Sequence, residues 1–254
     1  MLKNLTKAKL QAGETVFGCF VRYPSGSFVE VLGYQGWDFL VFDGEHGTIT
    51  PEDCENMVRA AELRGVTPIV RVTTNQAPTI LRFMDTGAQG IQVPWVNSAD
   101  EAEAAVRAIK YHPRGNRGLA GVRAADYAQV APLADYVKQA NEETLVVLQV
   151  ETAEAVDQLP DMINTDSLDV VFIGPTDLSH SFGVPGEPEH PAVQDAIERI
   201  VEIVGSSQAV LGTMALTQEA TKLWLDRGAR YITVTSESLL RSASHEYLLK
   251  VREG

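Results

Sequence analysis

The stretch WDFLVFDGEHG, residues 37–47, decides how the rest of the chain is interpreted. Its apolar half has the length and composition of a buried strand, and it runs directly into Asp43, Glu45 and His46. Three ionisable side chains on one turn are costly inside a core, but they suit the rim of a site. The turn is therefore expected to be a strand end that faces a site.

The same pattern of a short apolar run followed by a helix-like stretch recurs along the chain. Eight strands are expected, at residues 15–20, 39–43, 68–72, 90–95, 145–151, 169–174, 209–214 and 231–235. Amphipathic segments lie between them, among them residues 51–65, 98–111, 190–205 and 217–229. Eight alternations in 254 residues predict an α/β protein of the (β/α)₈ TIM-barrel type. No linker interrupts the pattern, so residues 1–254 are expected to form a single domain.

Two segments stand apart from the repeat. Residues 112–144 are too long for a simple connection, and we expect an elaborated loop above the barrel that ends as a helix. The glycines of GNRGLAG within it are a weak signal for a phosphate cradle, because their spacing matches no known fingerprint. The last helix, from about Ser236 to Val251, has an apolar face, for which packing on its own barrel is a simple reading.

Charge and cysteine content narrow the class of protein. With 34 acidic against 21 basic residues the net charge is −13, which argues against nucleic acid and anionic membranes as partners. An anionic substrate then needs its own local cation. Cys19 and Cys54 have no metal-type spacing and suggest a reducing compartment. No apolar run approaches the roughly 20 residues of a membrane span, so we expect a cytoplasmic protein.

In a barrel of this type the carboxyl-terminal strand ends converge on one mouth, where the chemistry takes place. Asp43, Arg71, Gln149, Glu151 and the Thr176–Asp177 pair all fall at or just beyond expected strand ends. Glu151 and Asp177 are two carboxylates that suit a hard divalent cation such as Mg²⁺ or Mn²⁺, with Co²⁺ as a further option. Their alternative reading is as surface acids.

His46 fits a proton-transfer group whose basicity is raised by Asp43 or Asp85, although a metal ligand is the other reading. Arg71 is expected to face the mouth and hold an oxyanion, unless it only forms a structural bridge to Asp43 or Asp85. Asp85 is almost as easily a turn or cap residue. Trp95, His180 and Phe182 either wall the substrate pocket or pack in the barrel. No lysine ends an expected strand, which disfavours an imine mechanism.

Several motifs together resemble the metal-dependent (class II) 2-oxo-acid aldolases, a family that includes 4-hydroxy-2-oxoheptanedioate aldolase and 2-dehydro-3-deoxyglucarate aldolase. The motifs are FDGEHG, IVRV, MDTGAQGIQVPWVNSADEAEAAV, YHPRGNRG, LQVETAEAV and FIGPTDLSHSFG, in the family's order and over most of the chain. The resemblance implies reversible cleavage of a 4-hydroxy-2-oxo acid to pyruvate and an aldehyde through a metal-stabilised enolate. It also implies a hexamer in which the last helix packs on a neighbouring subunit.

The resemblance further implies a role for each matched residue. His46 would be the proton acceptor, Arg71 would stabilise the enolate, and Asp85 would raise the basicity of His46. Glu151 and Asp177 would bind the metal, while Gln149 and the backbone of Thr176 would contact the substrate. The chain departs from the family's usual residues at Trp95, Thr176 and His180 and in the stretch TVTSESLL, which leaves the aldehyde open.

Two other functions remain compatible with the residues. The first is a related-barrel lyase acting on an acyl-CoA or phosphonate substrate, whose phosphate Arg114, Arg117 and Arg123 would meet. The second is a non-catalytic barrel that binds a metabolite.

Overall fold

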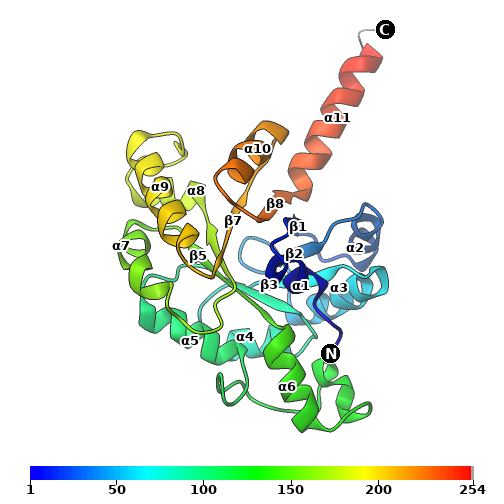
Figure 1. Ribbon diagram of the computed structural model, residues 1–254. Coiled ribbons are helices and arrows are strands. Elements are labelled where there is room, and N and C mark those ends of the chain that lie inside the picture. Colours follow the sequence, from blue (N-terminus) through cyan, green and yellow to red (C-terminus); the bar gives the residue numbers. More distant parts are fainter. Residues whose placement is uncertain (253–254) are drawn as a thin grey trace.

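The structure is a computed structural model that describes residues 1–252, and those residues form a closed barrel of eight parallel strands in chain order (Figure 1). The strands are β1 (Val16–Val21), β2 (Phe39–Asp43), β3 (Thr67–Arg71), β4 (Gly90–Val93), β5 (Leu145–Val150), β6 (Val170–Ile173), β7 (Val210–Met214) and β8 (Tyr231–Thr235). Each lies at a position expected from the sequence, so the (β/α)₈ prediction is confirmed. Only the last two residues of the predicted domain lie outside the described residues.

Helices alternate with the strands along the chain, and most of them surround the barrel (Figure 1). They are α1 (Leu5–Gln11), α2 (Gly26–Gly33), α3 (Pro51–Arg64), α4 (Ala77–Met84), α5 (Ala99–Ile109), η1 (Arg123–Ala128), α6 (Leu133–Glu143), α7 (Ala153–Met162), α8 (Pro175–Ser181), α9 (Pro191–Gly205), α10 (Gln218–Asp226) and α11 (Ser236–Arg252). Local chemistry fixes where they begin. Thr50 and Asp53 form a reciprocal capping box at the start of α3, where Pro51 is tolerated because its missing N–H has no helical partner.

The interior of the barrel is apolar up to the level of the site. Phe39 stacks on Tyr231 with their ring centroids 4.3 Å apart, and Phe20 contacts Phe172 at 6.2 Å. Gly18 leaves room for this packing, because a Cβ there would lie 2.2 Å from the Phe39 ring. These aromatic side chains form the floor on which the polar side chains of the carboxyl-terminal strand ends rest.

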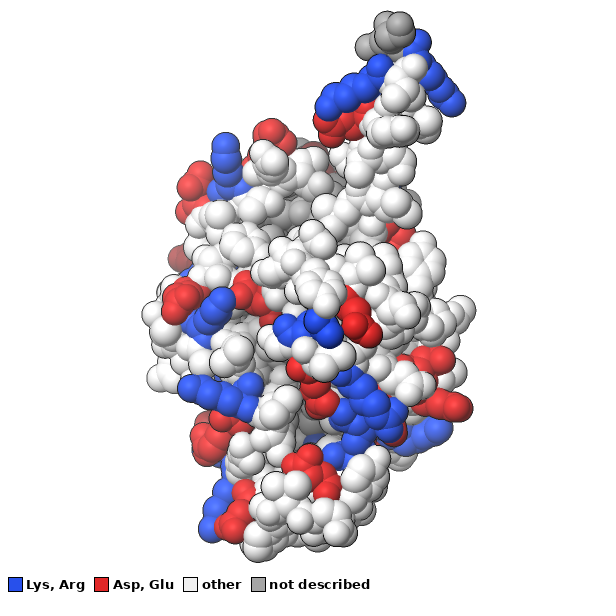
Figure 2. Space-filling model, turned by 90° about the vertical axis from the view of Figure 1, so that its right-hand side faces the viewer, with Lys and Arg blue, Asp and Glu red and all other residues white. Residues whose placement is uncertain are grey.

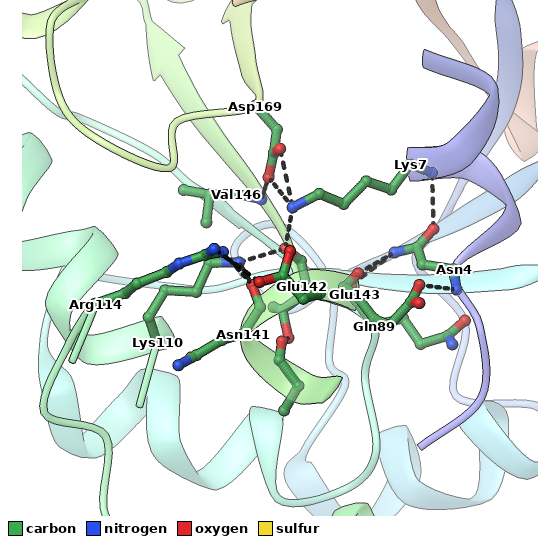
Figure 3. Close-up of polar contacts among 12 residues, drawn as sticks. Asn4, Lys7, Gln89, Lys110, Arg114, Asn141, Glu142, Glu143, Val146 and Asp169 are labelled. Atoms are coloured by element: carbon green, nitrogen blue, oxygen red, sulfur yellow. Dashed lines mark hydrogen bonds and ion pairs between the residues drawn. The ribbon is translucent and has the colours of Figure 1, made fainter. Parts of the chain in front are cut away.

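The amino-terminal end of the barrel is closed by α1. Leu10 is buried in the same apolar cluster as the strand residues, and Thr6 donates to the carbonyl of Asp38, just before β2. Lys7 pairs with Asp169 at 3.0 Å (Figure 3) and donates to the carbonyl of Thr144. These contacts link the first helix to the starts of strands that are distant in sequence.

The elaborated segment 112–144 lies at this amino-terminal end, so the expectation that it sits above the barrel mouth is wrong. It follows helix α5, and a connection from a helix to the next strand returns to the amino-terminal side of the sheet. Lys110 and Arg114 donate to the carbonyl of Asn141 near the end of α6 (Figure 3). Asn4 in turn donates to the carbonyl of Glu143, which fixes the segment to the start of the chain.

The last helix, α11, projects away from the barrel instead of covering it (Figure 1). Figure 2 shows that the face of its stem turned to the viewer carries few charged side chains. Exposed apolar residues on α11 include Leu240, Tyr247 and Leu249. The single chain therefore does not use this helix to complete its own barrel. Among the residues described, no helix has the length and apolar character needed to cross a membrane.

Candidate active site

Arg71 and Asp43 form the centre of the site, at the ends of adjacent strands. The register of β2 and β3 places the two residues opposite one another. Arg71 donates from Nε to Asp43 Oδ1 at 2.9 Å and from Nη2 to Asp43 Oδ2 at 2.6 Å. Its guanidinium also lies over the Phe20 ring, 4.9 Å from the centroid. The predicted bridge to Asp43 is therefore present at the end of β3, and the role of Arg71 in holding an oxyanion stays a prediction.

Asp43 also organises the FDGEHG turn. Its Oδ1 accepts the backbone N–H groups of Glu45 and His46, at 3.2 and 3.1 Å, and Arg22 donates to Oδ2. Burial opposes ionisation of Asp43, but the hydrogen bonds and charge of Arg71 hold its pKa below the usual value. Gly47 permits the tight turn, because a Cβ there would lie 2.3 Å from the Asp43 carbonyl oxygen.

His46 and Glu45 line the mouth beside this pair. The His46 side chain is 54% exposed, and its Nε2 lies 4.0 Å from Glu45 Oε2. Glu45 also forms an ion pair with Arg71 Nη1 at 3.1 Å and accepts from the Trp95 indole at 3.2 Å. Burial raises the pKa of Glu45 although Arg71 opposes that shift. Asp43 meets only the backbone of His46, so the expectation that Asp43 supports its imidazole is wrong.

Of the two acids predicted to bind the metal, Glu151 is the more deeply buried, with 2% of its surface exposed. Its Oε1 accepts the backbone N–H of Trp95 at 2.8 Å, and its Oε2 accepts from Gln149 Nε2 at 2.6 Å. Burial raises the pKa of Glu151 to about 7, and the charges of Asp177 and Glu45 act in the same direction. A cation at this point would relieve the repulsion among these carboxylates.

The donor set fits a hard divalent cation that keeps several waters. Asp177 lies in the first turn of α8 and is near enough to Glu151 to affect its pKa. A Cβ on Gly174 would lie 2.8 Å from Glu151 Oε2, so glycine leaves that oxygen accessible. Within residues 1–252 no three histidine, cysteine or acidic side chains gather as one ligand cluster. Mg²⁺ and Mn²⁺ are typically coordinated by one or two carboxylates together with waters and substrate oxygens.

Asp85 does not join this group within one chain. It is the C-cap residue of α4, on the amino-terminal side of β4, and Arg117 donates to it at 2.7 Å. The alternative reading of Asp85 as a cap residue is therefore confirmed, and its role in raising the basicity of His46 stays a prediction. Arg114 pairs with Glu142 and Arg123 donates to the carbonyl of Thr86, which engages these arginines away from the mouth.

Trp95 contributes more than the pocket wall expected from the sequence. Its backbone adopts φ of 55°, which is unusual for a bulky residue, and this directs its N–H to Glu151. The indole is 45% exposed at the mouth. Thr176 and His180 are exposed on α8, whereas Phe182 packs against the core between strands and helices. The contacts of Glu45 and Trp95 were missed, since no sequence spacing indicates them.

Known proteins share this sequence and architecture. A family model described as HpcH/HpaI aldolase/citrate lyase matches residues 16–242. A 4-hydroxy-2-oxo-heptane-1,7-dioate aldolase of Escherichia coli is 34% identical over 247 residues, 97% of this chain and 94% of that protein.

Two further matches agree with that model. A hydroxypyruvate/pyruvate aldolase of Sagittula stellata is 41% identical over 196 residues, 77% of this chain and 76% of that protein. A crystal structure of an HpcH/HpaI aldolase/citrate lyase family protein from Burkholderia cenocepacia superimposes with a TM-score of 0.93 at 32% identity, covering 98% of this chain and 99% of that one. The resemblance seen in the motifs is confirmed, and this chain belongs to the HpcH/HpaI aldolase/citrate lyase family.

Proposed function

We propose that the protein is a carbon–carbon lyase that reversibly cleaves a 4-hydroxy-2-oxo acid to pyruvate and an aldehyde. The family and its aldolase relatives support this reaction. The observation that carries it is the position of Arg71, a buried guanidinium held by Asp43 and Glu45 at the carboxyl-terminal strand ends. Aldol cleavage develops negative charge on the pyruvate portion, and a fixed cation in a water-poor site stabilises that charge.

Glu151 and Asp177 would hold the divalent cation, Mg²⁺ or Mn²⁺ with Co²⁺ as a further option. When bound, the cation would act as a Lewis acid on the keto oxygen of the substrate. Gln149 keeps an amide N–H for the substrate carboxylate, and the backbone N–H of Thr176 lies in the first turn of α8, where helical N–H groups lack a partner.

The remaining residues move the proton and stabilise charge. His46, exposed at the mouth, would accept the proton of the C4 hydroxyl as the C3–C4 bond breaks. The electron pair of that bond stays with the pyruvate portion as its enolate, opposite Arg71. A proton then returns to C3 and gives pyruvate, while the aldehyde leaves past Trp95.

The aldehyde portion of the substrate is left open, since the two aldolase relatives are named for different substrates. Exchange of deuterium into the methyl group of pyruvate tests the shared half-reaction without an aldehyde. We expect exchange in the presence of Mg²⁺ or Mn²⁺ and its loss after chelation. Full exchange after exhaustive chelation, or trapping of the protein by borohydride with pyruvate, would refute the proposal.

Assembly into a hexamer is part of the same proposal. An apolar cavity of about 230 Å³ beside α10 is lined by Phe17, Trp37 and Leu216, close to the base of α11. The projecting α11 of a neighbouring subunit would cover this surface. Asp85 lies on the amino-terminal side of the barrel, away from His46 of its own chain. In a hexamer, Asp85 of one subunit would support His46 of a neighbouring subunit. A sedimentation mass equal to one 27.7 kDa chain would count decisively against the assembly.

The two rival functions receive less support. The hypothesis of a lyase for acyl-CoA or phosphonate substrates required Arg114, Arg117 and Arg123 to bind the phosphate. These arginines form ion pairs away from the mouth. A non-catalytic barrel would bind metal and pyruvate without proton exchange. The exchange assay therefore also distinguishes an aldolase from a non-catalytic metabolite-binding barrel. The unpaired, buried Cys19 and Cys54 agree with a cytoplasmic location, which we retain as a proposal.

A further inference from the structure

A chain of three buried side chains runs from the wall of the barrel to the metal site. Gln92 Nε2 donates to Gln149 Oε1 at 2.6 Å, and Gln149 Nε2 donates to Glu151 Oε2 at 2.6 Å. Gln92 is completely buried on β4, and Gln149 is 1% exposed on the adjacent β5. Neither amide reaches bulk solvent, so each depends on the other for its orientation.

The carboxylate of Glu151 sets the direction of the whole chain. With a cation bound, Glu151 would be ionised and would only accept hydrogen bonds, so Gln149 must turn its NH₂ group toward it. The carbonyl oxygen of Gln149 then faces Gln92, which must donate. If both amides were reversed, two oxygens would meet at 2.6 Å, the separation between Gln149 Nε2 and Glu151 Oε2.

Two unpaired polar groups result from this direction. Gln149 retains one N–H that is not bonded to Glu151, on the amide that faces the site. At the other end, Gln92 Oε1 is buried without a hydrogen-bond partner among the described residues. An amide buried with one unsatisfied oxygen is costly, and this cost is retained where the other end of the amide serves the site.

We propose that Gln92 is a positioning residue for the reaction: its N–H holds the Gln149 amide in the single orientation that supports Glu151 and leaves one N–H for the substrate. The substrate part of this role rests on the proposed function. Without Gln92, the Gln149 side chain would lose the bond that fixes its carbonyl oxygen. Its amide would then sample other rotamers, and Glu151 would lose a constant donor.

A double-mutant cycle on Mn²⁺ binding tests the proposal without depending on turnover. Gln92→Met keeps the length of the side chain and removes its donor, while Gln149→Ala removes the group through which Gln92 acts. We expect the Mn²⁺ dissociation constant to rise about 3- to 10-fold in Gln92→Met, the worth of one neutral hydrogen bond. In Gln149→Ala we expect a rise of about 10-fold or more, as for other partners of metal ligands.

The double variant shows whether Gln92 positions Gln149 or only stabilises the barrel as a whole. If Gln92 acts through Gln149, Gln92→Met adds less than about a twofold change in the Gln149→Ala background. An equal effect of Gln92→Met in both backgrounds, or no effect in either, would overturn the proposal. Gln92→Leu, which also lacks a donor, repeats the cycle should the methionine variant not fold.

Tyr231→Phe provides a matched control in the same barrel interior. It removes a fully buried hydroxyl that also lacks a partner, on a strand that does not contact the Gln92–Gln149–Glu151 chain. We expect its Mn²⁺ affinity to equal that of the wild type. The Michaelis constant for pyruvate in methyl-proton exchange, measured in parallel, should rise in Gln92→Met with little change in maximal rate. Absence of exchange in the wild type would reject the proposed function, while the Mn²⁺ cycle would still decide the role of Gln92.

Discussion

Arg71 donates two hydrogen bonds to Asp43, and a second ion pair joins its Nη1 to Glu45 at 3.1 Å. The planar fork of an arginine is needed for this arrangement, because a lysine carries the charge at one point. We expect Arg71→Lys to lower both aldol cleavage and pyruvate proton exchange by about 10²- to 10³-fold, since enolate formation is common to the two reactions. Rates of both reactions at saturating metal are the measurement. Loss of cleavage with normal exchange would show that Arg71 does not act on the enolate.

His46→Ala distinguishes a proton acceptor from a metal ligand. Its imidazole is exposed at the mouth and lies near Glu45. We expect cleavage to fall by about 10²- to 10⁴-fold, the usual contribution of a positioned acid–base group, while Mn²⁺ affinity stays within about twofold of wild type. The rate is followed across a metal titration. Recovery to near wild-type rate at saturating Mn²⁺ would make His46 a ligand.

Trp95→Ala tests whether the exposed indole limits the size of the aldehyde. The change removes the bond from the indole to Glu45 and widens the mouth, while the backbone N–H that holds Glu151 is retained. We expect kcat/KM for a four-carbon semialdehyde to rise about tenfold relative to that for glycolaldehyde, because one pocket contact is worth about this much discrimination. Trp95→Phe, which keeps the bulk but not the indole N–H, is the control and should change the ratio little. An unchanged ratio in Trp95→Ala would place the aldehyde elsewhere.

Lys110 should make stability depend on pH. It donates to the carbonyl of Asn141 (Figure 3) and to that of Thr144. Burial lowers its pKa from 10.5 to about 7, with the charge of Lys7 acting in the same direction. Between these two values the unfolded chain holds a proton that the folded chain lacks. The contribution of this group to the free energy of unfolding therefore rises with pH from about 7 upward, by at most about 1.4 kcal/mol per pH unit.

Lys110→Met should lack this part of the pH dependence. Denaturant unfolding of both proteins at pH 7, 8 and 9, at one protein concentration, measures the difference between them. We expect the wild type to gain stability relative to the variant over this range. A constant difference would mean that the buried amine keeps its proton throughout.

Strand and helix positions followed from the sequence because they depend on local alternation. Glu151 and Arg71 were also placed at the mouth correctly, since a strand end determines its own side of the barrel. Asp85 was read either as a cap residue or as a support for His46, and the structure shows the cap. It follows a helix and precedes a strand, which places it on the amino-terminal side of the barrel. Residues 112–144 also follow a helix and precede a strand, so the same reasoning would have placed them on the amino-terminal side.

Other features depend on contacts that no local pattern encodes. Trp95 meets Glu45 and Glu151 across about 50 residues of sequence in each direction. Its left-handed backbone arises from those contacts, whereas a tryptophan alone disfavours that conformation. Gln92 likewise reads as an ordinary strand residue until Gln149 is placed beside it.

The closure of the barrel by α1 also bears on the order of folding. The helix is synthesised before the strands that it contacts, yet Lys7 pairs with Asp169, and Arg230 donates to the carbonyl of Leu10 at a separation of 220 residues. Contacts of such long range form slowly, because the intervening loop must be closed before they contribute. The amino-terminal helix must therefore wait for nearly the whole chain to emerge from the ribosome, and its docking is expected to be a late step that makes the barrel fold as one cooperative unit.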